Sequence, residues 1–194
     1  MASLDRRGRR RPVVLLSVGL ASLLVSLADL VHSQTAPTVV PMTAHNLTWF
    51  LHPPQDGSTA GGFTMNQIPA PTRGLTVQLL SQPAWFSDPT LTGVFGPGAL
   101  FRLTLPCTIG VLINVTYRLS ITNAEGSGEQ ILGSQTEPMP MCFGTRTIFF
   151  PVETPVTLEN QRLKLTIFTT VSAVLNLTTG PGTFLLTTNY TGTP

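Results

Sequence analysis

After Asn46, hydrophobic and polar residues alternate along most of the chain. The clearest case is Val111–Thr122, where Val, Ile, Tyr and Leu occupy every second position and Asn, Thr, Arg and Ser lie between them. Such a period of two indicates a strand with one buried face and one solvated face. Ala99–Leu105 and Leu163–Thr170 repeat the pattern. We therefore expect half-buried antiparallel strands.

Strand-like runs recur along the chain, separated by turns rich in Gly and Pro, and none has the period of a helix of useful length. The number and spacing of the runs predict an all-β domain over residues 46–194, an antiparallel two-sheet β-sandwich of jelly-roll or immunoglobulin-like topology. The pattern does not choose between these topologies. The expected strands are Leu47–Leu51, Leu75–Leu80, Ala99–Leu105, Val111–Thr122, Glu129–Leu132, Thr145–Phe150, Leu163–Thr170, Ala173–Leu177 and Thr183–Thr188.

The N-terminus has a different pattern, because an arginine cluster at residues 6–11 is followed by an apolar run, Val13–Leu27. Val31 and Ser33 fit the small-residue positions of a signal-peptidase site. The run is intermediate between a signal segment and a span, which needs about 20 apolar residues. We expect residues 1–33 to be a signal peptide or a signal-anchor helix, and residues 34–45 to be a linker. The protein is then extracytoplasmic, either secreted or anchored to the outer face of a membrane.

Charge argues against a nucleic-acid partner. The chain has 11 basic and 9 acidic residues, and the first 33 residues hold five of the former and two of the latter. Residues 34–194 therefore keep six basic and seven acidic residues, a net charge of −1. The remaining arginines are scattered singly, and Lys164 is the only lysine. Nucleic-acid affinity by counterion release needs a clustered basic surface.

An exported protein with an even number of cysteines is expected to form a disulfide, here between Cys107 and Cys142. Four Asn-x-Thr sequons make the chain a candidate glycoprotein, although they are equally consistent with unmodified asparagines. The sequons begin at Asn46, Asn114, Asn176 and Asn189. We expect no cofactor and no metal site, because Asp56 and Asp88 are better explained as turn residues than as calcium ligands.

Two Trp-Phe pairs, Trp49–Phe50 and Trp85–Phe86, are candidates for ligand binding, because exposed rings can stack on the apolar faces of sugars. Core packing is the stronger interpretation of these pairs. Catalysis has thin support: His32, His45 and His52 are the histidines, and no GxSxG, HExxH or phosphate-binding glycine loop occurs. The sequence thus predicts that the chain is not an enzyme.

Several features together resemble the jelly-roll sandwich modules of bacterial exported and cell-surface proteins. They are TWFLH after residue 46, PAWFSDP at Pro83–Pro89, the long alternating strand before a Gly/Ser loop, and TPVTLENQRLKLTIFT before the last strands. The resemblance implies a module that binds carbohydrate, packs against neighbours or forms part of a surface assembly. It covers most of residues 46–188, and its motifs are unspecific.

We therefore expect a non-catalytic exported cell-surface β-sandwich with a structural or interaction role, its partners being envelope proteins or glycans and, if residues 1–33 are retained, the membrane. The first alternative is a small carbohydrate-binding module that uses the Trp-Phe pairs. The second is a filament subunit in which the last strands pair between copies.

Overall fold

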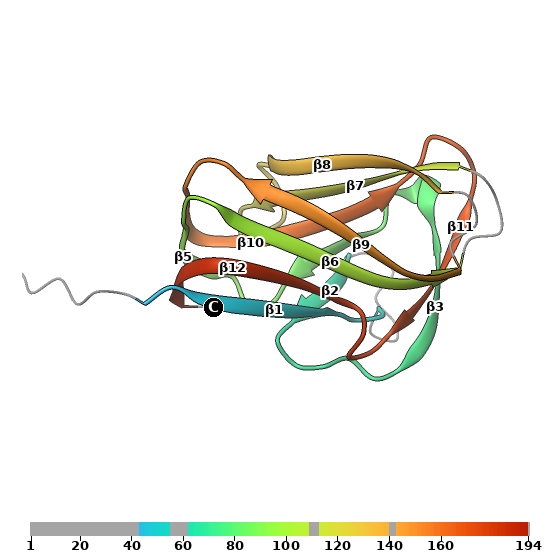
Figure 1. Ribbon diagram of the computed structural model, residues 1–194, viewed down its shortest axis with the longest axis horizontal. Coiled ribbons are helices and arrows are strands. Elements are labelled where there is room, and N and C mark those ends of the chain that lie inside the picture. Colours follow the sequence, from blue (N-terminus) through green and yellow to red (C-terminus); the bar gives the residue numbers. More distant parts are fainter. Residues whose placement is uncertain (1–42, 55–61, 109–112, 140–142, 194) are drawn as a thin grey trace, which may run out of the picture. The chain divides into compact units, whose positions relative to one another are not determined.

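The computed structural model describes residues 43–54, 62–108, 113–139 and 143–193, and most of them lie in strands (Figure 1). The chain divides into Met1–Pro41 and Met42–Pro194, and every described residue belongs to the second unit. The strands are β1 His45–Leu51, β2 Phe63–Asn66, β3 Arg73–Gln78, β4 Ala84–Ser87, β5 Leu91–Phe95, β6 Ala99–Thr108, β7 Ile113–Thr122, β8 Gln130–Met139, β9 Phe143–Val152, β10 Val156–Phe168, β11 Val174–Thr179 and β12 Phe184–Thr193.

Strand pairing is nested along the chain. The innermost pair is β7 with β8, and β6 with β9, β5 with β10, β3 with β11 and β1 with β12 follow outward in turn. All of these pairs are antiparallel. The chain is thus organised as one long antiparallel ribbon, in which strands of its first half pair in reverse order with strands of its second half.

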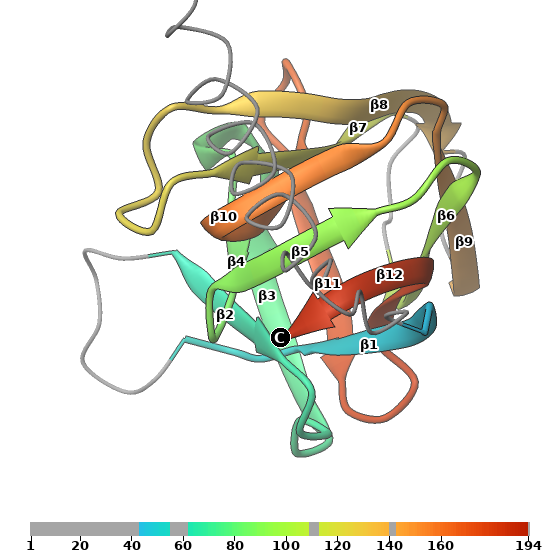
Figure 2. The ribbon, with the colours of Figure 1, turned by 90° about the vertical axis from the view of Figure 1, so that its left-hand side faces the viewer.

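The folded ribbon forms two layers, which we call the β10 layer (β7, β8 and β10) and the β6 layer (β1, β6, β9 and β12) (Figures 1 and 2). Two connections join the layers by hydrogen bonds. β5 pairs with both β10 and β12, and β2 pairs with β1 on one side and β4 on the other, while β4 pairs with β10. The sheet is therefore continuous from one layer to the other at the end where β2, β4 and β5 lie.

The core lies between the layers and is filled by the inward positions of each strand. Phe101, Leu103 and Leu105 of β6 and Leu163, Leu165 and Ile167 of β10 are all fully buried. Aromatic rings dominate the end closed by β5: the ring centroids of Phe95 and Phe101 are 4.9 Å apart, and those of Phe95 and Tyr190 are 5.2 Å apart. Burial of this apolar surface is the main favourable term in folding.

The expectation of an all-β domain is confirmed, and each of the nine predicted runs contributes to a strand. The sheet is mixed, however, because β2 and β4 run parallel. Between β2 and β4 the chain passes through β3, which pairs with β11. β4 can therefore return beside β2 and run in the same direction. The sequence prediction missed β2, β4 and β5, which have only four or five residues each and leave little room for an alternating pattern.

The predicted signal or anchor helix and residues 34–42 of the predicted linker lie outside the described residues, whereas His45, assigned to the linker, begins β1. Within the part that is described, no helix has the length and apolar character needed to cross a membrane. The one helical element there is a 3-10 turn, Leu79–Ser81.

Candidate functional site

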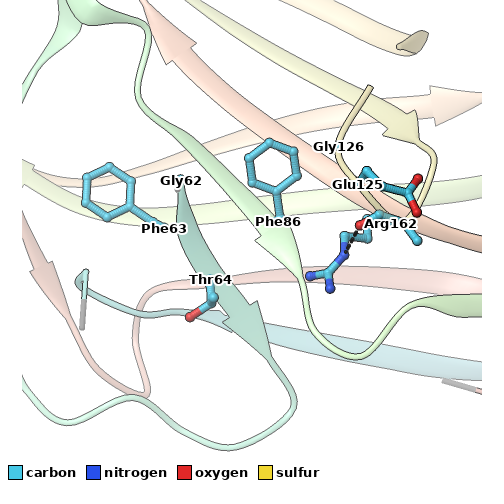
Figure 3. Close-up of a pocket in the computed structure, with 8 residues that line it drawn as sticks. Gly62, Phe63, Thr64, Phe86, Glu125, Gly126 and Arg162 are labelled. Carbon is cyan, nitrogen blue, oxygen red and sulfur yellow. Dashed lines mark hydrogen bonds between the residues drawn. The ribbon is translucent and has the colours of Figure 1, made fainter. Parts of the chain in front are cut away.

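A hollow of about 350 Å3 opens on the outer side of the sheet where β2, β4 and β10 meet the 123–127 turn (Figure 3). We call it the Phe86 pocket. Phe86 lies in the middle of the drawn group, between Thr64 of β2 on one side and Arg162 of β10 on the other. The lining residues are Gly62, Phe63, Thr64, Phe86, Ala124, Glu125, Gly126 and Arg162.

Phe86 points outward because its neighbour Trp85 points inward. The Trp85 ring is fully buried, stacks on Phe63 at 4.6 Å between centroids, and donates Nε1–H to the His52 carbonyl oxygen at 3.2 Å. Strand alternation then turns Phe86 to the opposite face. The backbone packs closely on the Phe86 ring at two glycines, since a Cβ on Gly62 would lie 2.6 Å from the ring and one on Gly126 would lie 3.3 Å from it.

Arg162 is held in a fixed orientation by backbone oxygens. Its Nε–H donates to the Ala124 carbonyl at 2.9 Å and its Nη1 donates to the Ser87 carbonyl at 3.0 Å. The Asp88 carboxylate lies 3.9 Å from the same Nη1. Within the described part of the chain, Nη2 makes no hydrogen bond, and the side chain keeps 28% of its exposure. The guanidinium thus retains donors for a ligand while its position is set by the protein.

The 123–127 segment is a closed turn between β7 and β8. The Asn123 side chain accepts the Ser127 N–H at 2.8 Å and donates to the Ser127 hydroxyl at 2.8 Å. Backbone hydrogen bonds from Asn123 N to Ser127 O and from Gly126 N to Asn123 O complete it. Gly126 has a φ of 87°, a region that glycine enters without strain. The turn carries Glu125, which is exposed, at the edge of the pocket.

A charged cluster borders the pocket along β10. The Glu129 carboxylate accepts from the Ser120 hydroxyl at 2.7 Å and from Lys164 Nζ at 3.0 Å. Lys164 Nζ also lies 5.9 Å from the centroid of the Phe86 ring. Burial acts to raise the pKa of Glu129, but the two hydrogen bonds and the charges of Lys164 and Arg118 outweigh it and hold the pKa below its usual value. Glu129 is therefore ionised, and neutralises much of the charge of Lys164.

A second hollow, of about 300 Å3, lies on the other side of Thr64 and contains His52. The Asn66 side-chain oxygen accepts the Ile68 N–H at 2.9 Å, so the same oxygen faces His52 Nε2, also at 2.9 Å. The Ile68 carbonyl lies 3.0 Å from this nitrogen as well. Two acceptors require Nε2 to carry the proton, which leaves Nδ1 of the neutral ring as an acceptor. His52 is thus held as one tautomer.

The four rings that were candidates for sugar binding differ in burial. Trp49 and Trp85 are 1% and 0% exposed, so both rings fill the core, as the stronger interpretation predicted, and neither offers an exposed platform. Phe50 and Phe86 are half-buried on the outer face. Phe50 packs edge-on against Phe184 at 6.4 Å, whereas Phe86 belongs to the pocket.

The other predicted positions remain predictions. Cys107 is 5% exposed and is not a free thiol, but Cys142 lies outside the described residues, as does Asp56. Asn46, Asn114 and Asn176 are exposed, and Thr76 donates to the Asn176 side chain at 2.8 Å. The Asn189 side chain is engaged, because its Nδ2 donates to the Pro97 carbonyl at 2.9 Å.

Among the described residues, no group of three or more His, Cys, Asp or Glu side chains could hold a metal ion. Asp88, considered above as a calcium ligand, lies instead beside Arg162.

Sequence reasoning missed most of the pocket. Thr64 belongs to β2, a strand that the sequence did not predict, and Gly62 immediately precedes that strand. Arg162 was treated as one of several scattered arginines. The available signal was weak: an outward arginine on an alternating strand, and a Phe beside a Trp that would itself be buried.

No protein family matches the sequence, and no curated relative does. Solved structures do match the fold. Two crystal structures of a CocE/NonD family hydrolase from Staphylococcus aureus have TM-scores of 0.51 and 0.53, with 9% and 7% identity, over 76% and 77% of this chain. A weaker match, with a TM-score of 0.46 and 9% identity over 77% of this chain, is an aminopeptidase from the marine sediment archaeon Thaumarchaeota archaeon. This chain spans 37% of the length of each of these three proteins.

These matches correct the functional expectation. The fold is one found within hydrolase chains, so the prediction of a non-catalytic surface protein that is not part of an enzyme is wrong. The carbohydrate-module and filament alternatives depended on the same expectation and are not retained. The resemblance to exported jelly-roll modules holds only in that the matching structures are rich in β-strands. At such low identity the likeness concerns the fold alone.

Proposed function

We propose that this chain is the substrate-recognition β domain of a hydrolase, and that the Phe86 pocket binds part of the substrate. The observation that carries the proposal is the fold match to hydrolase chains of which this domain is about a third, 37%. The pocket supports it, because it combines an apolar ring with a fixed guanidinium, the combination typical of ligand sites.

The nested pairing favours a jelly-roll topology over an immunoglobulin-like one. A jelly roll is a double sheet built from Greek keys, in which early and late strands pair as they do here in β3 with β11 and β1 with β12. An immunoglobulin-like sandwich instead separates its strands into two sheets that pack face to face. The continuous sheet at the β2 and β5 end of this domain fits the former better.

Under this proposal, the hydrolytic residues are supplied by the remainder of the enzyme, in the same polypeptide or in a partner subunit. His52 has the correct ring geometry for a base, but its described neighbours at Nε2 are the Asn66 amide and the Ile68 carbonyl, and neither is a carboxylate. Binding of a remote part of the substrate in the Phe86 pocket would still accelerate hydrolysis, because that binding energy positions the reacting bond.

We further propose that the domain works outside the cytoplasm. The apolar N-terminal run supports export, by cleavage or by anchoring to the membrane. A Cys107–Cys142 disulfide fits the same setting, since Cys107 pairs in register with Gly144, two positions after Cys142 in the sequence.

The test is to isolate the protein from its native source under mild conditions, together with whatever it binds, and to assay it on panels of aryl esters and aminoacyl anilides. We expect hydrolysis of at least one class. Phe86→Ser should lower kcat/KM at least tenfold, equivalent to a loss of about 1.4 kcal/mol of transition-state binding.

Phe149→Ser is the matched control, because Phe149 is an outward Phe of the β6 layer and is 48% exposed. It should leave kcat/KM unchanged. A native preparation that hydrolyses no ester or amide contradicts the proposal. Equal effects of the two Phe substitutions would show that the Phe86 pocket has no part in recognition.

A further inference from the structure

We propose that the Phe86 pocket recognises a small carboxylate that carries an apolar or aromatic group, with Arg162 binding the carboxylate and Phe86 contacting the apolar part. This inference rests on the proposed function only in taking this carboxylate to be part of the substrate. Binding itself can be measured without hydrolysis.

Arg162 is preorganised to bind an anion. Two backbone carbonyls take the Nε–H and one Nη1–H, as described above, which fixes the plane of the guanidinium before any ligand arrives. A fixed planar guanidinium loses little entropy on binding and can present neighbouring N–H groups to both oxygens of a carboxylate. The Nη2 donors, which have no partner in the described part of the chain, are the groups available for this contact.

Thr64 supplies a further polar group on the opposite side of Phe86 (Figure 3). Its hydroxyl makes no hydrogen bond with any described residue, and its side chain lines the pocket. A hydroxyl can donate to a carboxylate oxygen, so Arg162 and Thr64 together offer donors but the Phe86 ring between them offers none.

The size of the pocket limits the ligand. About 350 Å3 is at the lower end of the range for small-molecule sites, roughly 300 to 1,000 Å3. The backbones of Gly62 and Gly126 approach the Phe86 ring closely, since a Cβ at these positions would lie 2.6 Å and 3.3 Å from it, so a ligand meets only the rest of this half-buried ring. The apolar part of the ligand therefore packs against the ring, and its carboxylate reaches Arg162.

Two protein carboxylates oppose such a ligand. Asp88 lies 3.9 Å from Arg162 Nη1 and is 58% exposed, and Glu125 is exposed at the pocket edge. Lys164, above the ring, is largely compensated by Glu129. Removal of the Glu125 charge should consequently strengthen binding of an anion. A purely structural role of Arg162 does not predict this increase in affinity.

The experiment is a titration of the full chain with phenylacetate and with its neutral isostere phenylacetamide, followed by NMR shifts or calorimetry. We expect phenylacetate to bind at least tenfold more tightly. Glu125→Gln should tighten phenylacetate binding two- to threefold, and Thr64→Val should weaken it threefold or more. Glu153→Gln, which removes an exposed carboxylate outside the pocket, should change nothing.

Equal affinity for the acid and the amide, or no saturable binding of either, overturns the inference, and this comparison requires no variant that could misfold. Hydrolysis by the native preparation without a preference for carboxylates would leave the proposed function and remove this inference. Preferred carboxylate binding without any hydrolysis would do the reverse.

Discussion

β6 and β10 each pair with three other strands, and their inward faces are alike while their outward faces differ. β9 pairs with β6 along its whole length, and β12 and β11 pair with successive parts of β6. β10 pairs with β5 over residues 156–161 and with β7 over residues 162–168, where β4 also pairs with it. Inward, both strands present buried apolar side chains. Outward, β6 presents Leu100 and Arg102, and β10 presents Arg162 and Lys164.

The contrast lies in what covers the outward side chains. Arg162 and Lys164 contact the 123–129 segment, through the Ala124 carbonyl and the Glu129 carboxylate, and the Phe86 pocket forms beneath that turn. Arg102 is exposed and lies 5.6 Å from the Phe184 ring, beside Phe149 in the neighbouring strand. A sheet face becomes a site here because a connecting turn folds back over it, not because of the strand itself.

The strongest expected effect tests the similarity of the two inward faces. Phe101→Ala in β6 should lower the free energy of unfolding by about 3–5 kcal/mol, and Leu165→Ala in β10 by about 2–5 kcal/mol, because each leaves a cavity in a closed core. Chemical denaturation of both variants measures this. A loss below about 1 kcal/mol in one strand only would mean that the two layers do not share one core.

The next effect tests the difference between the outward arginines. Arg162→Ala removes a charged donor from two backbone carbonyls and should cost about 2–3 kcal/mol. Arg102→Ala removes an exposed cation–π contact and should cost about 0.5–1 kcal/mol. Denaturation under identical conditions compares them. Equal losses would show that the 123–127 turn does not depend on Arg162.

The sequence predicts the long strands of both layers because their period of two is sustained. In residues 99–105 and 115–119 the buried positions are the apolar ones identified from the pattern, whereas Ser120 and Thr122, which the pattern places on the solvated face, are also fully buried. The parallel pairing of β2 with β4 could not be predicted, since it depends on where the chain returns after β3 and not on either strand's own residues. For the same reason, the pattern does not reveal that β2 and β5 make the sheet continuous between layers.

The Phe86 pocket was less predictable than the fold. It draws on residues from 62 to 162, and the Gly, Ser and Asn composition of the 123–127 turn does not predict that this turn completes a pocket. The predicted Trp-Phe pairs identified the right neighbourhood in Pro83–Pro89 but emphasised the wrong ring. Trp85 has the larger apolar surface and enters the core, and alternation leaves Phe86 outside.

A smaller effect concerns the charged cluster of Glu129 and Lys164 on the β10 layer. The pKa of Glu129 is lowered in the folded state, so its ionised form stabilises the fold above its ordinary pKa of about 4.3. This contribution is lost as the pH falls from that value through the lowered pKa of the folded state. The stability difference between wild type and Glu129→Gln should therefore shrink on acidification through this window.

Lys164→Met provides the control for that titration, because it removes the cation 3.0 Å from the Glu129 carboxylate. NMR titration of the Glu129 side chain should then give a higher pKa than in the wild type. An unchanged pKa would assign the shift to the Ser120 hydrogen bond and the charge of Arg118.

The smallest expected effect concerns the apolar outward residues of the β6 layer. Phe149 and Leu100 are 48% and 38% exposed, in contrast to the covered side chains of β10. Phe149→Ser and Leu100→Ser should each change the free energy of unfolding by no more than about 0.5 kcal/mol, because exposed side chains away from hydrogen-bond networks contribute little. Denaturation at several protein concentrations measures this. A loss above about 1 kcal/mol that grows with protein concentration would show that this face is buried by association. The outward face of the β6 layer would then be covered, as that of the β10 layer is by the 123–129 segment.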